Sequence, residues 1–210
     1  MNTFKGHRII SDQVGQDELG VVWNELQKVL NRNVPGDIVE FGCYIGTTSL
    51  FIRRLLDEAG ESSARTLHVY DSFEGLPPKT MPDESPAGTQ FAAGALRVSK
   101  KELLAQFRAA DLTPPVVHKG WFNQLAPVDI PPSIAFAYLD GDFYDSIATS
   151  LNLVWPRLSP GAVVLVDDYE REALPGPAKA VHDFFATTRP MPRIVKIHDI
   201  AVIYCNDNRQ

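Results

Sequence analysis

The chain has 210 residues, of which 44% are apolar and 22% are charged, and its formal net charge is −6 with a pI near 5.3. This length suits a single domain with its own hydrophobic core, and the composition is that of a folded chain rather than a disordered one. The acidic balance argues against a general nucleic-acid binder or a binder of anionic membranes, because both need clustered positive charge.

Two cysteines, Cys43 and Cys205, stand far apart in the sequence. They form neither a C-x-x-C pair of the kind found in zinc sites nor a secreted disulfide framework. The first residues contain no apolar stretch typical of a secretory signal, and no apolar run reaches the ~18 residues of a membrane span. We therefore expect a cytoplasmic protein that does not cross a membrane.

Short runs rich in Val and Ile alternate along the chain with longer segments that have helical apolar spacing. In chain order we expect a helix at 17–30, a strand at 36–42, a helix at 46–59, a strand at 66–71, a helix at 99–110, strands at 115–119 and 134–140, a helix at 144–158, a strand at 162–167 and a helix at 177–187. Ser99 and Glu102 have the spacing of a capping box. This alternation predicts a parallel sheet with helices on both faces.

Two further strands are expected at 193–197 and 201–205, separated by three residues. A connection this short permits an antiparallel pair but not a crossover. A mostly parallel sheet that ends in an antiparallel hairpin distinguishes class I methyltransferases from nucleotide-dependent dehydrogenases. The hairpin therefore favours an α/β, Rossmann-like methyltransferase fold, with a seven-stranded, mostly parallel sheet, over a dehydrogenase fold, but it does not decide between them.

The whole chain, residues 1–210, is expected to form one domain. Residues 1–33 would form an N-terminal helical segment able to cover the site. The connection at 77–98 is rich in Pro, Ala and Gly, and it is either a lid over the acceptor or a mobile insertion.

Acidic residues end the expected strands, which is where functional groups collect in open α/β sheets. Asp140 and Asp142 follow one strand with Gly141 between them, and Asp167 and Asp168 follow the next. In an extended backbone Asp140 and Asp142 would point to the same side. If the two strands are neighbours, four carboxylates converge, and they need a raised pKa or a cation such as Mg²⁺. Alternatively, each Asp caps the turn that follows its strand.

A glycine loop, E-F-G-C-Y-I-G from Glu40 to Gly46, follows the first expected strand and precedes a helix that opens with Thr47 and Thr48. The dehydrogenase pattern G-x-G-x-x-G does not fit this loop, whereas E-x-G-x-x-x-G is typical of enzymes that use S-adenosylmethionine (SAM). Free N–H groups at the start of such a helix attract a carboxylate; alternatively, the glycines form only a tight turn. Asp71 ends the second strand, where it can accept both hydroxyls of an adenosine ribose or cap the turn after it.

Five strings along the chain resemble the macrocin O-methyltransferase family, whose members methylate sugar hydroxyls with SAM and Mg²⁺. They are G-D-I-V-E-F-G at 36–42, D-S-F-E-G-L-P at 71–77, K-G-W-F at 119–122, L-D-G-D-F-Y at 139–144, and L-S-P-G at 158–161 followed by V-D-D-Y at 166–169. A looser match follows at 175–181. The resemblance covers most of the chain from Val34 onward.

The resemblance implies roles for individual residues. The metal ligands would be Asp140, Asp167 and Asp168, and the general base would be Asp142. The residues that the resemblance places around SAM are Glu40, Gly42, Gly46, Asp71, Ser72, Gly120 and Trp121. From their place in the glycine loop and at the start of its helix, Tyr44, Thr47 and Thr48 are also expected to bind SAM. The family also implies a homodimer.

The expected function is Mg²⁺-dependent methyl transfer from SAM to a hydroxyl of a sugar, in a glycoside, a natural product or a polysaccharide. A close alternative is a metal-dependent O-methyltransferase of catechols or other phenols. More distant alternatives are a metal-dependent phosphotransfer enzyme or hydrolase that uses the Asp residues, and a SAM-binding regulatory module.

Overall fold

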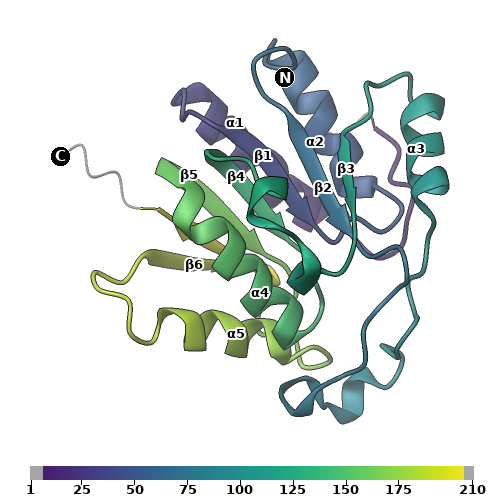
Figure 1. Cartoon of the computed structure of the whole chain (residues 1–210), viewed down its shortest axis with the longest axis vertical. Coiled ribbons are helices and arrows are strands. Elements are labelled where there is room, and N and C mark those ends of the chain that lie inside the picture. The colour runs from purple at the N-terminus through teal and green to yellow at the C-terminus, as the bar shows by residue number, and fades with distance from the viewer. Residues whose placement is uncertain (1–6, 206–210) are drawn as a thin grey trace.

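A single seven-stranded sheet forms the centre of the molecule in the computed structural model, which describes residues 7–205 (Figure 1). The strand order is β3-β2-β1-β4-β5-β7-β6. The strands are β1 (Asp37–Phe41), β2 (Leu67–Asp71), β3 (Val116–Lys119), β4 (Ile134–Leu139), β5 (Leu158–Val166), β6 (Arg193–Ile197) and β7 (Ile200–Tyr204). The first five strands are parallel, while β7 is antiparallel to both β5 and β6, so the predicted sheet and hairpin are confirmed.

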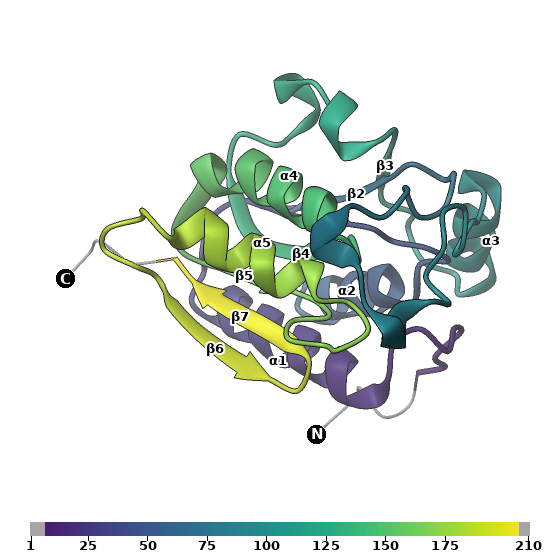
Figure 2. The same cartoon turned by 90° about the horizontal axis from the view of Figure 1, so that it is seen from below.

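Five helices cover the two faces of the sheet, as Figure 2 shows from below. They are α1 (Gln16–Asn31), α2 (Thr47–Glu58), α3 (Lys100–Ala109), α4 (Tyr144–Val154) and α5 (Gly176–Phe185). α1, α2 and α3 pack on one face and α4 and α5 on the other. Side chains along β1 alternate between the two faces: Ile38 packs in the core on the side of α1, α2 and α3, and Val39 packs in the core on the side of α4 and α5. All six residues of β4 are buried, as burial on both faces requires.

Two expected boundaries, the end of one helix and the start of the next strand, are wrong. The helix predicted at 144–158 ends at Val154, a short 3₁₀ turn covers Trp155–Arg157, and β5 already begins at Leu158 rather than at 162. Pro156 lies inside this turn, and proline lacks the N–H that would continue the helix. Gly161 then takes a φ of 83°, and the pairing of β4 with β5 shifts register between Ile134 and Phe136, so the strand continues through a local irregularity.

The segment between β2 and α3 contains two short 3₁₀ helices, Met81–Asp83 and Pro86–Gly88. It runs along the end of the sheet at which the parallel strands terminate (Figure 1). A small apolar cluster ties it to the rest of the chain, since Leu76 packs with Phe143 and Leu174, and Phe91 packs against them. At the end of this segment, the predicted capping box of α3 is present: the Glu102 carboxylate accepts the Ser99 N–H at 2.8 Å.

The strand order reverses direction between β1 and β4. On one side of β1 lie β2 and β3, and on its other side lie β4 and β5. In open α/β sheets, ligands bind at the carboxyl ends of the strands beside such a switch point. Gly42 follows β1 and Asp140 follows β4, so the predicted glycine loop and the predicted acidic group meet there.

Candidate active site

A cavity of about 670 Å³ opens at this switch point. Nine of the residues predicted from the sequence line it. On the side of β1 and β2 they are Gly42, Tyr44, Asp71, Ser72 and Trp121, and on the side of β4 and β5 they are Asp140, Asp142, Asp167 and Asp168. The structure therefore brings the glycine loop and the acidic residues to one space.

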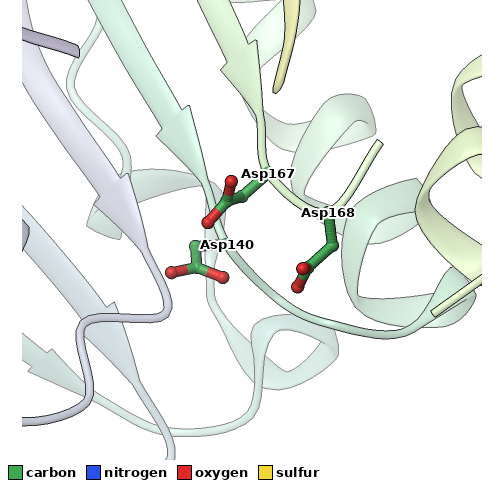
Figure 3. A group of neighbouring side chains, drawn as sticks. All are labelled: Asp140, Asp167 and Asp168. Atoms are coloured by element: carbon green, nitrogen blue, oxygen red, sulfur yellow. The ribbon is translucent and has the colours of Figure 1, made fainter. Parts of the chain in front are cut away.

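Three carboxylates of this cavity form a tight group, with one oxygen from each lying within 4.8 Å of the others (Figure 3). Asp140 comes from the end of β4, and Asp167 and Asp168 come from the end of the neighbouring strand β5. Asp167 and Asp168 are 9% and 6% exposed, whereas Asp140 is half-buried. Carboxylate oxygens at this spacing fit a hard divalent cation.

Burial and mutual repulsion raise the pKa values of these carboxyl groups. Burial is the largest cause of the rise for Asp140, followed by the charges of Asp167 and Asp142. Burial, then the charge of Asp168, raises the pKa of Asp167 to about 7, although a hydrogen bond from Tyr138 opposes the rise. Acids held together in this way are stabilised by a positive charge between them, as a metal ion would supply.

Two protein groups already contact the acidic group. The Tyr138 hydroxyl donates to Asp167 Oδ2 at 2.7 Å, and Arg171 Nη1 lies 2.6 Å from Asp168 Oδ1. Among the described residues that line the cavity, Arg171 alone carries a positive charge. Arg171 lies three positions after Asp168. The sequence alone could have pointed to Arg171 only after Asp168 had been assigned to the site.

Asp142 faces the same cavity but does not belong to the group of three. Its φ is 58°, so the extended backbone expected between Asp140 and Asp142 is wrong: the chain turns sharply here. The Phe143 N–H donates to the Gly141 carbonyl at 2.6 Å within this turn. Burial, followed by the charges of Asp168 and Asp167, raises the pKa of Asp142, which therefore lies close to those acids.

Asp71 fastens the glycine loop to the end of β2. One carboxylate oxygen accepts the N–H groups of Cys43 and Tyr44 at 3.0 and 3.1 Å, and the other accepts the Phe73 N–H at 2.7 Å. The capping role considered for this residue is thus present in the structure. Each carboxylate oxygen has more than one lone pair, so hydroxyl donors can still reach Asp71 from the cavity.

The other residues predicted to surround SAM do not line the cavity, and all of them except the partly exposed Gly120 are buried behind its wall. They are Glu40, Gly46, Thr47, Thr48 and Gly120. Glu40 is 1% exposed and accepts a hydrogen bond from the hydroxyl of Ser49 in α2. Gly46 packs on Leu103 of α3, where a Cβ would come within 2.4 Å of that side chain. The Gly120 N–H donates to the Asp71 carbonyl at 2.9 Å.

Sequence reasoning missed Asp83, whose side chain is 1% exposed and reaches the cavity from the segment between β2 and α3. Asp83 lies 61 positions before Tyr144, whose N–H it accepts at 2.6 Å. No local pattern identifies a contact over such a separation.

None of the described helices is both long enough and apolar enough to span a bilayer.

A family model described as Macrocin-O-methyltransferase (TylF) matches residues 8–206 of the chain. A tetracenomycin relative from Streptomyces olivaceus, named 8-demethyl-8-(2,3-dimethoxy-alpha-L-rhamnosyl)-tetracenomycin-C 4'-O-methyltransferase, is 36% identical over 165 residues, which are 76% of this chain and 61% of the relative. Demethyldecarbamoylnovobiocin O-methyltransferase from Streptomyces niveus is 34% identical over 69% of this chain and 56% of its own length. The chain thus spans about three fifths of these curated relatives.

The fold comparison agrees. The solved structure of the O-methyltransferase NovP superposes with a TM-score of 0.79 and 30% identity, over 92% of this chain and 81% of that one. The family model covers nearly the whole sequence, and four of the strings that carried the resemblance contribute residues to the cavity wall, namely 36–42 through Gly42, 71–77, 119–122 and 139–144, as does V-D-D-Y at 166–169. The chain belongs to the macrocin O-methyltransferase family.

Proposed function

We propose that this protein transfers a methyl group from SAM to a hydroxyl of a natural-product sugar, with Mg²⁺ held by Asp140, Asp167 and Asp168. The observation that carries the proposal is the group of three carboxylates within 4.8 Å, placed beside the glycine loop in a chain of this family. The name of the Streptomyces olivaceus relative specifies methylation of a rhamnosyl group, which supports a sugar acceptor.

SAM would lie along the β1 and β2 side of the cavity. Gly42, Tyr44, Asp71, Ser72 and Trp121 offer it direct contacts from the wall. The residues behind the wall, among them Glu40 and Thr47, would act by shaping the loop and the start of α2. Asp71 combines both roles, because it holds the loop N–H groups and also faces the cavity.

The donor set of Asp140, Asp167 and Asp168 fits Mg²⁺, because all three ligands are carboxylate oxygens and their mutual repulsion needs a counter-charge. When bound, the ion would lower the pKa of a sugar hydroxyl that it contacts. Tyr138 and Arg171 hold Asp167 and Asp168 in place through hydrogen bonds to one oxygen of each.

Asp142 is the proposed general base, since it shares the cavity with the three ligands without being one of them. Its carboxylate takes the proton of the attacking hydroxyl as the hydroxyl oxygen bonds to the methyl carbon and the sulfur–methyl bond breaks. The products are a methyl ether, S-adenosylhomocysteine and protonated Asp142, which then releases its proton to water. SAM is already activated as a sulfonium, so the main contribution of the cavity is to align the reacting atoms.

Replacing the proposed base tests this assignment. Asp142→Asn should lower turnover by at least about 10²-fold, because general bases contribute that much or more, and should change SAM affinity less than about twofold. Asp145→Asn is the matched control: Asp145 also lines the cavity and should tolerate the change with less than about a tenfold loss. The readout is S-adenosylhomocysteine formation. Near-normal turnover in Asp142→Asn would remove Asp142 from the base role.

Acceptor competition tests the sugar assignment. Methyl α-L-rhamnopyranoside and catechol are offered together with SAM and Mg²⁺, and the methylated products are separated by chromatography. The proposal predicts methylation of the sugar, whereas methylation of catechol alone would identify a phenol methyltransferase. The homodimer and the cytoplasmic location stay predictions.

A further inference from the structure

The segment between β2 and α3 is attached to the turn that follows β4. Asp83 Oδ1 accepts the N–H of Tyr144, the first residue of α4, at 2.6 Å. Its other oxygen accepts the N–H and the hydroxyl of Thr80 at 3.0 and 2.8 Å, so the carboxylate is fixed from both sides. The residue is 1% exposed, and at this burial the carboxylate depends on these three donors.

The start of α4 needs such a partner. Its N-cap residue, Phe143, has no side chain that can accept the first free N–H groups of the helix. Asp83 supplies a carboxylate there from a distant segment, and negative charge at a helix N-terminus is stabilising. The turn that is held in this way contains Asp140 and Asp142.

The same segment also contacts the turn that follows β5. The Ser85 hydroxyl donates to the Glu172 carbonyl at 2.7 Å. Gly88 lies so close to Ala173 that a Cβ on it would be 2.1 Å from the Ala173 carbonyl oxygen. This second turn begins with Asp167 and Asp168 and contains Arg171.

Gly176, the first residue of α5, completes the arrangement. A Cβ at this position would lie 2.0 Å from Asp83 Oδ1 and 2.5 Å from the Tyr144 nitrogen. The hydrogen bond between Asp83 and Tyr144 therefore needs a glycine in α5. One short segment thus meets α4, α5 and the two turns that carry the acidic residues of the cavity.

We propose that Asp83 is a positioning residue that holds the Asp140–Asp142 turn and the Asp167–Asp168 turn at a fixed separation. Asp83 binds the first turn through Tyr144, and Ser85 of the same segment binds the second turn through Glu172. The segment at 80–88 is then a fixed brace rather than a lid, and the spacing of the three proposed metal ligands depends on it. The claim about the spacing of the metal ligands rests on the proposed function, whereas the bracing of the two turns does not.

Hydrogen exchange read by mass spectrometry tests the brace on the ligand-free protein. In Asp83→Ala, exchange in peptides that cover 141–146 and 168–174 should become about tenfold faster, because the Tyr144 N–H loses its acceptor and the nearby hydrogen bond from Ser85 to the Glu172 carbonyl is weakened. Gly176→Ala should give the same pattern at 141–146 while keeping the carboxylate, and Ser85→Ala should affect 168–174 alone. If Asp83→Ala does not fold, Asp83→Asn, which keeps one acceptor, serves in its place with a smaller change.

Glu102→Ala is the matched control. It also removes a carboxylate that accepts a backbone N–H at a helix start, but this carboxylate is exposed, belongs to the same helix, and caps α3 through Ser99. Its effect should stay within peptides near 99–103. Unchanged exchange at both turns in Asp83→Ala and Gly176→Ala would overturn the proposal, as would equal acceleration at these turns in Glu102→Ala.

Mg²⁺ binding, measured by calorimetry, tests the consequence for the ligands. Asp83→Ala should weaken Mg²⁺ binding about tenfold or more, the usual effect of losing a group that orients metal ligands, while SAM affinity changes less than about twofold. Faster exchange with unchanged Mg²⁺ affinity would overturn the claim that the brace sets the ligand spacing. Absence of Mg²⁺ binding in the unmodified protein would instead contradict the proposed function, and the exchange data would still decide the brace.

Discussion

At the scale of single residues, Glu40 shows how a side chain outside the cavity can affect the whole protein. Its carboxyl group is buried and accepts a hydrogen bond from Ser49. Burial, the largest cause, raises the pKa of Glu40 from 4.5 to about 8, although the hydrogen bond from Ser49 opposes the rise. The folded state therefore holds this proton more tightly than the unfolded state.

The pKa of Glu40 predicts a loss of stability as the pH rises. An acid whose pKa is raised by folding adds most to the free energy of unfolding below its unfolded pKa of 4.5. This addition decreases as the pH rises, until the pH passes about 8. Glu40→Gln keeps an acceptor for Ser49 but does not ionise. The stability of this variant relative to the unmodified protein should rise by about 1.4 kcal/mol per pH unit between pH 6 and 8. Urea unfolding of both proteins with metal chelated measures the difference, and parallel pH profiles would contradict it.

At the scale of elements, the loop after β1 packs tightly against the end of β4. Gly42 has a φ of 83°, and a Cβ on it would lie 1.7 Å from the Asp140 carbonyl oxygen. Both the positive φ and the missing side chain are needed, because the loop and the turn of a proposed metal ligand occupy neighbouring space.

Gly42→Ala should therefore damage both stability and the site. The positive φ and the overlap together should lower the free energy of unfolding by about 3 kcal/mol or more, and SAM binding should weaken because the loop moves. Gly60→Ala is the matched control: its φ is 72°, but nothing lies within 4 Å of its Cβ, so a loss of about 1 to 2 kcal/mol is expected. Chemical denaturation measures both variants, and equal losses would show that the contact with Asp140 is unimportant.

How far the sequence predicts the structure depends on the range of the interactions involved. The alternation of strands and helices and the acids at strand ends are local patterns, and they predicted the sheet, its hairpin and the meeting of Asp140 with Asp167. The left-handed turn at Asp142 was missed because Asp adopts a positive φ only occasionally, although more often than most residues. Asp83 was missed because its partner lies 61 positions away.

At the scale of the whole molecule, the topology explains why acidic residues accumulate in one place. β4 and β5 are neighbouring parallel strands, so their carboxyl ends, each ending in Asp, fall side by side at the switch point. The fold is thereby weakened by repulsion among buried carboxylates, and a bound cation would relieve it.

Mg²⁺ should consequently stabilise the protein. At 100 times its dissociation constant, a ligand that binds only the folded state adds about 2.7 kcal/mol, which corresponds to a rise in Tm of about 5 to 10 °C for a chain of this size. Differential scanning calorimetry of chelator-treated protein measures the rise. Asp167→Asn should be more stable than the unmodified protein without metal and respond little to Mg²⁺. An equal rise in both proteins would mean that the ion acts elsewhere.

The most direct test of the central claim is a calorimetric titration of SAM, with and without Mg²⁺, into protein stripped of both. The account predicts saturable binding of SAM and a separate Mg²⁺ signal that disappears in Asp167→Ala. A protein that binds SAM in neither condition would contradict the methyltransferase assignment, and the three carboxylates at the ends of β4 and β5 would then need a different explanation.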